Sequence, residues 1–230
     1  MRFFLLTLLF LPSLSNAAGG WTTVLDKPMS ARLQEIAKDR AKAYPALVKT
    51  AFDESQSLRL RWRALTTMGR ADAVYFKKDL ERALRGPQWF LRNAALIAIL
   101  NAPRDTAVKW SMELVKDPAL MVRTQAVRNL VGLEAKESEE FLWRELWSSR
   151  NFRKKESLWI RAHIAEALAR LADRGHQKAF QRLLMDPDPR LHKWAVLGLE
   201  KSTGLKLGGS GEAVEVQRQK WLARLGVETI

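Results

Sequence analysis

Two stretches of this chain, "DPALMVRTQAV" over residues 117–127 and "DPDPRLHKWAV" over residues 186–196, share one pattern. Both open with Asp-Pro and close with Ala-Val, and both carry an apolar residue followed by a basic one in between. A pattern that recurs within one chain indicates that the fold uses the same structural unit more than once. These two stretches therefore decide the class of fold.

Three further copies of the pattern appear when the rest of the chain is compared with it. The basic position recurs after steps of 31, 31, 38 and 31 residues. Apolar residues follow it three, four and seven places later. This spacing is typical of one face of a helix, not of the alternation of a strand. The five basic positions are Arg61, Arg92, Arg123, Arg161 and His192.

A second helix precedes each copy, as in "TAVKWSMELVK" over residues 106–116. Each unit is thus predicted to be an antiparallel helical hairpin with short connections. One hairpin cannot bury the apolar faces of both its helices, but a stack of hairpins can. The sequence therefore predicts an all-α protein, a right-handed α-solenoid of stacked antiparallel helical hairpins, with one row of helices inside its curve and one outside.

The array resembles HEAT repeats, in particular the short bacterial type with Asp-Pro, Val-Arg and Ala in each unit. The resemblance covers residues 55–204, and "DPALMVRTQAVRNL" from Asp117 is the best-matching copy. It implies that the recurrent arginines are structural and bond to neighbouring units. His192 departs from the family pattern, so the last unit is expected to be looser or to act as a cap.

The two ends of the chain lie outside the array. Residues 1–17 combine one positive charge, a nine-residue apolar run and small residues, which is typical of a secretory signal cleaved near Ala17. Residues 18–54 are predicted to form an N-terminal helical cap with a break or kink at Pro45. Residues 205–230 are predicted to form a Gly-rich turn and a C-terminal capping helix.

The rest of the chain favours export in soluble form. No later apolar run is long enough to span a bilayer. The chain contains no Cys, which excludes disulfides and a lipoprotein anchor, and it has no N-glycosylation sequon. We therefore expect a bacterial protein that is periplasmic or secreted.

The charge of the chain favours anionic partners. It has 39 Lys and Arg against 25 Asp and Glu, a formal net charge of +14. Nucleic acid, an acidic polymer and a charged membrane surface are all compatible with this excess. The alternative is a basic surface that serves only solubility.

The chain lacks the motifs that catalysis usually requires. It has no Cys nucleophile, Gly-x-Ser-x-Gly elbow, phosphate-binding loop or His-Glu-x-x-His motif. His163 and Glu166 lie one helical turn apart and could share a metal, but two ligands are an incomplete site. No catalytic residue, metal site or cofactor is predicted.

The resemblance brings two enzyme classes into consideration. Some proteins with similar repeats are phycobilin lyases, but nothing beyond the repeats matches them. Some HEAT-like proteins are alkylpurine DNA glycosylases, in which aromatic side chains hold DNA and a carboxylate stabilises charge on the sugar. Trp110 with Glu113 is the nearest imitation here, and the wider pattern does not match. An exported protein rarely meets genomic DNA, so nucleic acid is not the expected partner.

A binding surface is predicted from the two columns that follow the basic position, because they vary freely between copies. Their residues are expected to point away from the core, which would expose the aromatic members. Large aromatic and Arg side chains are effective binding anchors. The candidates on this inner face are Trp62, Arg63, Lys193 and Trp194; packing of the two Trp under the terminal helices is the alternative.

A second candidate surface is the seven-residue excess in the fourth repeat. It falls in "SSRNFRKKES" from Ser148, between the two helices of one unit. Insertions in a repeat array emerge as loops on one face, often a binding face. The candidates are Arg150, Phe152, Arg153, Lys154 and Lys155; a solvated loop without a partner is the alternative.

Together these observations favour a non-enzymatic, exported scaffold that binds a protein partner in the bacterial envelope. A binder of an anionic polymer or of membrane headgroups, acting through the basic loop and inner face, is the first alternative. A nucleic-acid enzyme of the glycosylase type is the second, and it requires that residues 1–17 are not a signal.

Overall fold

The computed structural model describes residues 17–172 and 175–227. Over these residues the protein is all-α apart from one small β-hairpin, as the sequence predicts. The predicted signal, except for Ala17, lies outside the described residues. The helices are α1 (Ala17–Asp26), α2 (Met29–Lys38), α3 (Arg40–Phe52), α4 (Leu58–Asp72), α5 (Lys77–Arg85), α6 (Trp89–Ala98), α7 (Arg104–Leu114), α8 (Leu120–Gly132), α9 (Glu139–Leu146), α10 (Ile160–Leu171), α11 (Gln177–Leu184), α12 (His192–Thr203) and α13 (Val214–Arg224).

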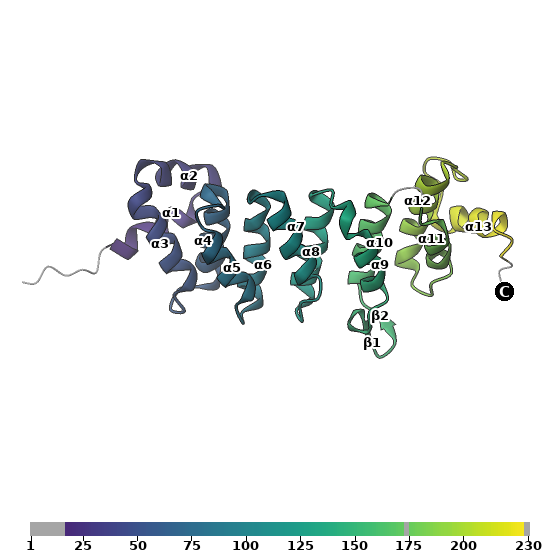
Figure 1. The fold of residues 1–230 in the computed structure, drawn as a ribbon, viewed down its shortest axis with the longest axis horizontal. Coiled ribbons are helices and arrows are strands. Elements are labelled where there is room, and N and C mark those ends of the chain that lie inside the picture. Colours follow the sequence, from purple (N-terminus) through teal and green to yellow (C-terminus); the bar gives the residue numbers. More distant parts are fainter. Residues whose placement is uncertain (1–16, 173–174, 228–230) are drawn as a thin grey trace, which may run out of the picture.

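From α3 to α12 the helices run up and down across the long axis of an elongated molecule, and the chain advances from one end to the other (Figure 1). From α4 to α12 the even-numbered helices form one row, in which each contacts the next. Each even-numbered helix also packs on the odd-numbered helix before it. We call these the even row and the odd row. The described helices include none long and apolar enough to cross a membrane.

The turns that lead into the even row all lie along one edge of the molecule (Figure 1), which we call the turn edge. Odd-row helices end at this edge and even-row helices begin there. The strands β1 (Phe152–Arg153) and β2 (Glu156–Ser157) pair antiparallel and project beyond it between α9 and α10. The turn edge comprises residues 53–57, 86–88, 115–119, 147–159 and 185–191.

The apolar columns of the repeat form the core. Every residue three, four and seven places after the basic position is at most 3% exposed in all five copies. Small residues allow the even row to pack closely. A Cβ atom on Gly69 of α4 would lie 2.4 Å from the backbone oxygen of Ala98 in α6, so only glycine fits at this contact.

The N-terminal region differs from the prediction at Pro45, because α3 continues through this residue. The break falls at Asp39 instead, whose extended backbone ends α2 and whose side chain accepts a hydrogen bond from the Lys42 amide. Proline removes one helical donor, and here the remaining bonds and packing hold the helix together.

The C-terminal helix α13 packs on α12 through Trp221 and Leu222, which are buried. Val214 and Val216, which lie in its first turn, are exposed. Only the second half of the helix therefore has a buried face.

Candidate binding surfaces

The recurrent basic residues bond first to the turn of their own hairpin. The guanidinium of Arg92 donates to the carbonyl oxygen of Gly86 at 2.9 Å, six residues earlier. Arg123 donates to the Asp117 carbonyl at 2.8 Å, and His192 Nε2 lies 2.8 Å from the Asp186 carbonyl oxygen. All five basic side chains are buried. His192 thus keeps the contact to its own turn although it is not an arginine.

Two of these arginines also bond to the Asp of the next Asp-Pro turn, 25 residues later. Arg92 donates to both carboxylate oxygens of Asp117 at 2.6 and 2.9 Å. Arg161 contacts both oxygens of Asp186 at 2.6 and 3.3 Å. In the first hairpin Arg61 bonds instead to the Gln88 side-chain oxygen at 2.7 Å. Paired Arg–carboxylate bonds are strong and geometrically specific.

Arg123 is the exception in this series. Its side chain contacts only backbone oxygens, and its Nε has no hydrogen-bond partner among the described residues. Ser148 stands 25 residues later, at the separation where Asp117 follows Arg92 and Asp186 follows Arg161. Burial, with the nearby charge of Arg150, lowers the pKa of Arg123. The insertion that begins here therefore leaves one buried cation without a carboxylate.

The predicted inner face lies on the even row, but less of it is exposed than the sequence predicts. Ala94 and Thr124, which belong to the two variable columns, are buried. Trp62 and Trp194 are half-buried and pack against the core. An even-row helix has neighbours on both sides and behind it, so only a narrow strip faces solvent, and the expectation of two exposed columns is wrong.

The four candidate residues of this face lie at opposite ends of the row. Arg63 donates to the carbonyl of Leu25 and forms an ion pair with Asp26, so it fixes the end of α1. Lys193 is exposed, and its Nζ lies 4.9 Å from the centre of the Trp194 ring. The structure does not bring the Trp62 end and the Trp194 end together, because α6, α8 and α10 lie between α4 and α12.

The basic insertion forms a β-hairpin rather than an irregular loop. Phe152 pairs with Ser157 and Arg153 with Glu156 across the two strands. Lys154 and Lys155 make the turn with φ of 51° and 68°. Positive φ at both central residues is the geometry of the tight turns that fit the twist of a β-hairpin, and Asn-Gly is its preferred sequence. We call residues 152–157 the basic hairpin.

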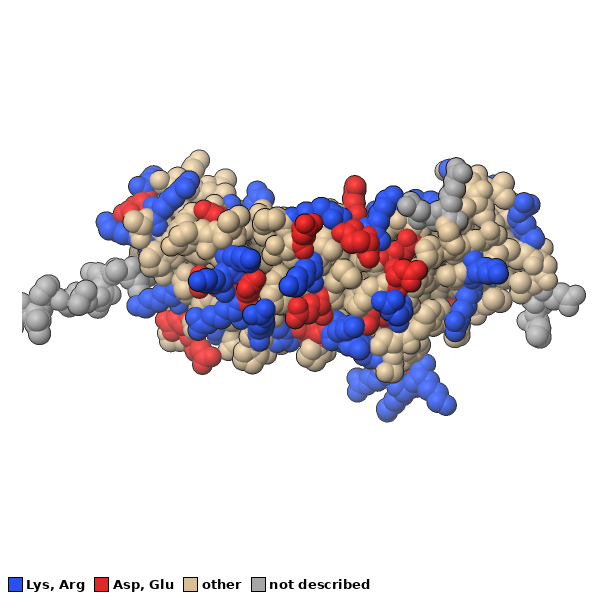
Figure 2. Space-filling view, viewed as in Figure 1, with Lys and Arg blue, Asp and Glu red and all other residues tan. Residues whose placement is uncertain are grey.

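The tip and the base of this element have different roles. Arg153, Lys154 and Lys155 are exposed at the tip, where the charged side chains project from the turn edge (Figure 2). Phe152 lies at the base, with its ring centre 4.5 Å from the Arg161 guanidinium. Arg150 also belongs to the base, since it donates to the Lys116 carbonyl at 3.2 Å and lies 3.5 Å from the Glu145 carboxylate.

A cavity of ≈ 600 Å³ lies between the basic hairpin and the following Asp-Pro turn. Phe152 and Lys155 line one side of it, and Asp188 and Arg190 the other. The hydrogen bonds that Arg190 and Ser157 donate to Asp188 outweigh its burial and keep the pKa of this carboxyl low. Asp188 in turn raises the pKa of Arg190. Two acidic groups of the cavity wall, Asp186 and Asp188, are thus held by partners within the protein.

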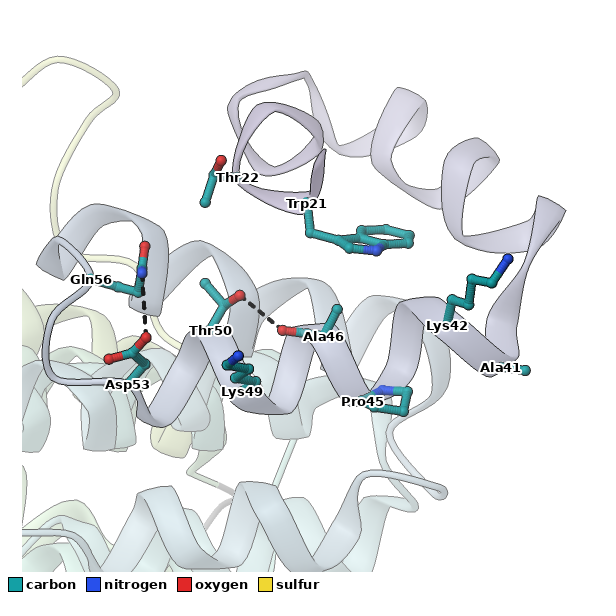
Figure 3. A pocket seen from close by; sticks show the side chains of 10 residues that line it. All are labelled: Trp21, Thr22, Ala41, Lys42, Pro45, Ala46, Lys49, Thr50, Asp53 and Gln56. Atoms are coloured by element: carbon teal, nitrogen blue, oxygen red, sulfur yellow. Dashed lines mark hydrogen bonds between the residues drawn. The ribbon is translucent and has the colours of Figure 1, made fainter. Parts of the chain in front are cut away.

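A second hollow, of ≈ 470 Å³, lies between α1 and α3 near the N-terminal end (Figure 3). Trp21 of α1 faces the surface of α3 formed by Pro45, Ala46 and Thr50. The Thr50 hydroxyl donates to the Ala46 carbonyl, so it can accept from a ligand but not donate to one. Sequence analysis missed this groove, because it depends on how two helices outside the repeat meet.

The residues considered for metal binding and for base recognition are His163 with Glu166 and Trp110. His163 Nδ1 lies 3.9 Å from Glu166, and burial with the charge of Arg128 lowers the pKa of His163. Across the described residues no group of three potential metal ligands occurs. Trp110 is 3% exposed and lies under the guanidinium of Arg85, so it cannot grip a base without rearrangement.

Sequence analysis also missed a series of cation–π contacts that join the helices of the odd row. Arg82 lies 4.0 Å from the ring centre of Phe52, and Arg85 lies 4.8 Å from that of Trp110. Lys116 lies 5.1 Å from Phe141, and Arg182 lies 4.4 Å from Trp147. The signal was present as a basic residue near the end of one odd-row helix and an aromatic residue in its neighbour.

Comparison with known proteins gives a likeness of fold only. The crystal structure of an engineered protein, a target of the Northeast Structural Genomics Consortium, is similar with a TM-score of 0.50 and 19% identity. The likeness covers 82% of this chain and 89% of that one. No protein-family model and no curated protein matches the chain.

Proposed function

We propose that this chain is an exported, non-enzymatic scaffold that binds a protein partner in the bacterial envelope, and that the basic hairpin is its main contact. In this proposal the stack of hairpins is a right-handed α-solenoid of HEAT-like repeats. The stack provides a rigid support, and the hairpin carries unpaired positive charge beyond the turn edge. Candidate partners therefore present an acidic surface patch.

The observation that carries the proposal is the composition of the tip. Three consecutive cations are exposed there, and none has an ion-pair partner among the described residues. Some other exposed cations of the chain are engaged, as in the pairs of Arg104 with Glu137 and Lys220 with Glu212. Unpaired charge at a projecting point favours electrostatic steering of an anionic partner.

The backbone of the turn supports the same conclusion. Lys154 and Lys155 both adopt a left-handed conformation that costs an L-residue about 1–2 kcal/mol, and that glycine or asparagine adopts more readily. A sequence chosen for stability would carry Asn-Gly at these positions. The lysines therefore lower stability locally, which is expected where a side-chain charge has a use.

The conflict between the stability of the turn and the charge of its two lysines provides the test. The variant Lys154→Asn/Lys155→Gly keeps the turn and removes two charges, so it should be at least as stable as the wild type and should lose the partner. A photoreactive residue replacing Glu156 should capture the partner in intact envelopes, and the same residue at Lys77, on the opposite edge, should not. Equal capture by the wild type and by the Asn-Gly variant would refute the proposal.

A second candidate function is binding of an anionic polymer or of membrane headgroups, and the same unpaired charge favours it. Salt dependence separates the two. Binding that rests on charge alone should weaken steeply as salt rises, because ions screen exposed charges over about 8 Å at physiological salt. A protein contact that also buries apolar surface should weaken less. Capture that survives 0.5 M salt, roughly three times physiological ionic strength, would favour the protein partner.

The inner face has a subordinate place in this proposal. Trp62 and Trp194 are half-buried, and Arg63 is engaged by Asp26. Lys193 is the one member of the predicted set that is exposed. A Trp62→Ala/Trp194→Ala variant is therefore expected to retain the partner, and loss of capture in a variant that remains folded would restore the inner face as the main contact.

A further inference from the structure

The odd row carries a set of arginines whose position differs from that of the basic hairpin. Arg82, Arg85 and Arg182 lie in the last turn of their helices, α5 and α11, and all three are exposed. Because odd-row helices end at the turn edge (Figure 1), these three positions lie at that edge, with α7 and α9 between the two on α5 and the one on α11. Each guanidinium is held over an aromatic ring of a neighbouring element.

These arginines have no carboxylate partner among the described residues, unlike the buried arginines of the even row. An aromatic ring fixes the guanidinium by its face and leaves the N–H groups along its edge available. The side chain is therefore ordered before any ligand arrives, which lowers the ordering cost of binding. The full charge also exceeds the roughly half negative charge at a helix C-terminus, so positive charge remains to attract an anion.

A shallow groove lies beside Arg182, so the surface has an apolar depression next to its positive charge. It has a volume of ≈ 310 Å³ and lies between α9 and α11. Trp143 and Trp147 form its apolar wall, and Arg144 and Arg182 lie at its rim. Arg144 is 4.0 Å from Glu140, so that ion pair is weak. A carboxylate here would meet two guanidinium groups beside apolar surface.

We propose that this surface, Arg82 and Arg85 together with Arg144 and Arg182, binds an extended acidic peptide segment. The inference rests on the proposed binding of a protein partner but uses residues other than the hairpin. The four arginines lie on α5, α9 and α11, so an extended segment that runs along the turn edge can pass all of them. A segment with Asp or Glu at every third position presents a carboxylate about every 10 Å along its length. Arg binds carboxylates through two parallel hydrogen bonds.

A flat membrane fits this surface less well than a peptide does. The basic hairpin projects beyond the turn edge, so a flat anionic surface that meets its tip stands away from the odd row (Figure 1). A flexible segment can follow the row and still reach the hairpin. Nucleic acid also carries charge at short intervals, so it is included in the test as a competing outcome.

The test uses the chain without residues 1–17 and a fluorescent 15-residue peptide with Glu at every third position. Fluorescence anisotropy should show binding that the same peptide with Gln for Glu does not show. The variant Arg82→Gln/Arg85→Gln/Arg182→Gln should weaken it about tenfold, since three exposed ion pairs are lost. The control Arg40→Gln/Lys77→Gln/Lys206→Gln removes three exposed cations at the opposite edge and should change affinity less than twofold.

Two measurements keep the test decisive. The variant Arg82→Lys/Arg85→Lys/Arg182→Lys retains charge and should bind with intermediate affinity, and thermal unfolding of all variants identifies any loss that is due to unfolding. Equal weakening by the row and control variants, no binding of the acidic peptide, or tighter binding of oligothymidylate of equal charge would overturn the inference. If the peptide binds while the hairpin captures no partner, the hairpin proposal fails and this one stands.

Discussion

The contact between α8 and α10 differs from the contacts on either side of it. Between α6 and α8, Arg92 holds both oxygens of Asp117, and between α10 and α12, Arg161 contacts both oxygens of Asp186. At the middle contact Arg123 reaches only backbone oxygens. We call the first two the paired junctions and the middle one the open junction.

The difference shows what the insertion costs and what it supplies. A turn with Asp-Pro provides a carboxylate to the arginine of the previous hairpin and a carbonyl to the basic residue of its own hairpin, so each paired junction fixes two hairpins at once. The open junction gives up this carboxylate and gains the basic hairpin in its place. A buried cation without a paired charge lowers stability, so the hairpin is not there to strengthen the fold. This reasoning agrees with the unfavourable backbone of Lys154 and Lys155.

The largest effect is expected when a paired junction is made to resemble the open one. Asp186→Ala leaves Arg161, which is 1% exposed, without its carboxylate. Removing one partner of a buried ion pair typically costs about 3–5 kcal/mol. Asp117→Ala should have an effect of similar size on the Arg92 junction. Chemical denaturation followed by circular dichroism measures both changes.

The matched control is Ser148→Ala, at the equivalent position of the open junction. Ser148 accepts a hydrogen bond from the exposed Arg150 side chain and holds no buried charge, so its loss should cost about 1 kcal/mol or less. Equal losses for Ser148→Ala and Asp186→Ala would remove the distinction between the two kinds of junction.

A second comparison concerns how closely the helices approach. Gly69 of α4 has the Ala98 backbone where a Cβ would lie, whereas Gly132, the last residue of α8, has nothing within 4 Å. Gly69→Ala should therefore cost about 1–3 kcal/mol through overpacking. Gly132→Ala should be neutral or stabilising by up to about 1 kcal/mol, because Ala favours the helix. Thermal unfolding of the two variants gives the measurement, and a destabilising Gly132→Ala would show that α8 packs more tightly than its contacts indicate.

The sequence predicted the parts of this molecule that depend on spacing. The basic and apolar columns of the repeat follow from helical periodicity, and they are buried in the structure as an all-α stack requires. The parts that depend on contacts between units could not be predicted from the spacing of residues. Arg63 was predicted at a binding face but fixes α1, and Trp62 and Trp194 are half-buried. Arg150 was grouped with the tip, but a hydrogen bond to Lys116 places it at the base.

The odd-row cation–π contacts were not predicted from the sequence, for the same reason. Arg85 and Trp110 lie in different hairpins, and no spacing within one helix connects them. The break at Asp39 and the continuation of α3 through Pro45 also depend on packing of the N-terminal helices. Local sequence favoured a break at proline, and the surrounding contacts outweighed it.

Adding the missing carboxylate to the open junction tests the comparison of the two kinds of junction in the opposite direction. Ser148→Asp places an acidic group 25 residues after Arg123, the separation found in both paired junctions. A charged hydrogen bond to Arg123 should raise the free energy of unfolding by about 1–2 kcal/mol. The same variant adds negative charge near the base of the basic hairpin, so partner capture should weaken while stability rises. A loss of stability would mean that the introduced carboxylate cannot reach Arg123.

The smallest effect is expected from acid, and of the two kinds of junction the paired one should show it. Hydrogen bonds from Arg190 and Ser157 keep the pKa of Asp188 below its ordinary value of about 3.9. A carboxyl with a lower pKa in the folded state stabilises the protein above its unfolded pKa and loses this contribution as pH falls through the folded one. Stability should therefore decrease below about pH 4, and Asp188→Asn should reduce the decrease. Because Arg190 is half exposed, the pair contributes about 0.2–1 kcal/mol.

Amide hydrogen exchange at pH 5 and pH 3 locates this loss. Protection of the first turn of α12 should fall at the lower pH, because Asp188 also accepts a hydrogen bond from the Arg190 amide just before that helix. Arg123 bonds to carbonyl oxygens, which do not titrate. Ionisation of its partners should therefore contribute nothing to the protection of the first turn of α8. Loss of protection in α12 that is unchanged by Asp188→Asn would assign the acid sensitivity to other carboxylates, with Asp186 as the next group to replace.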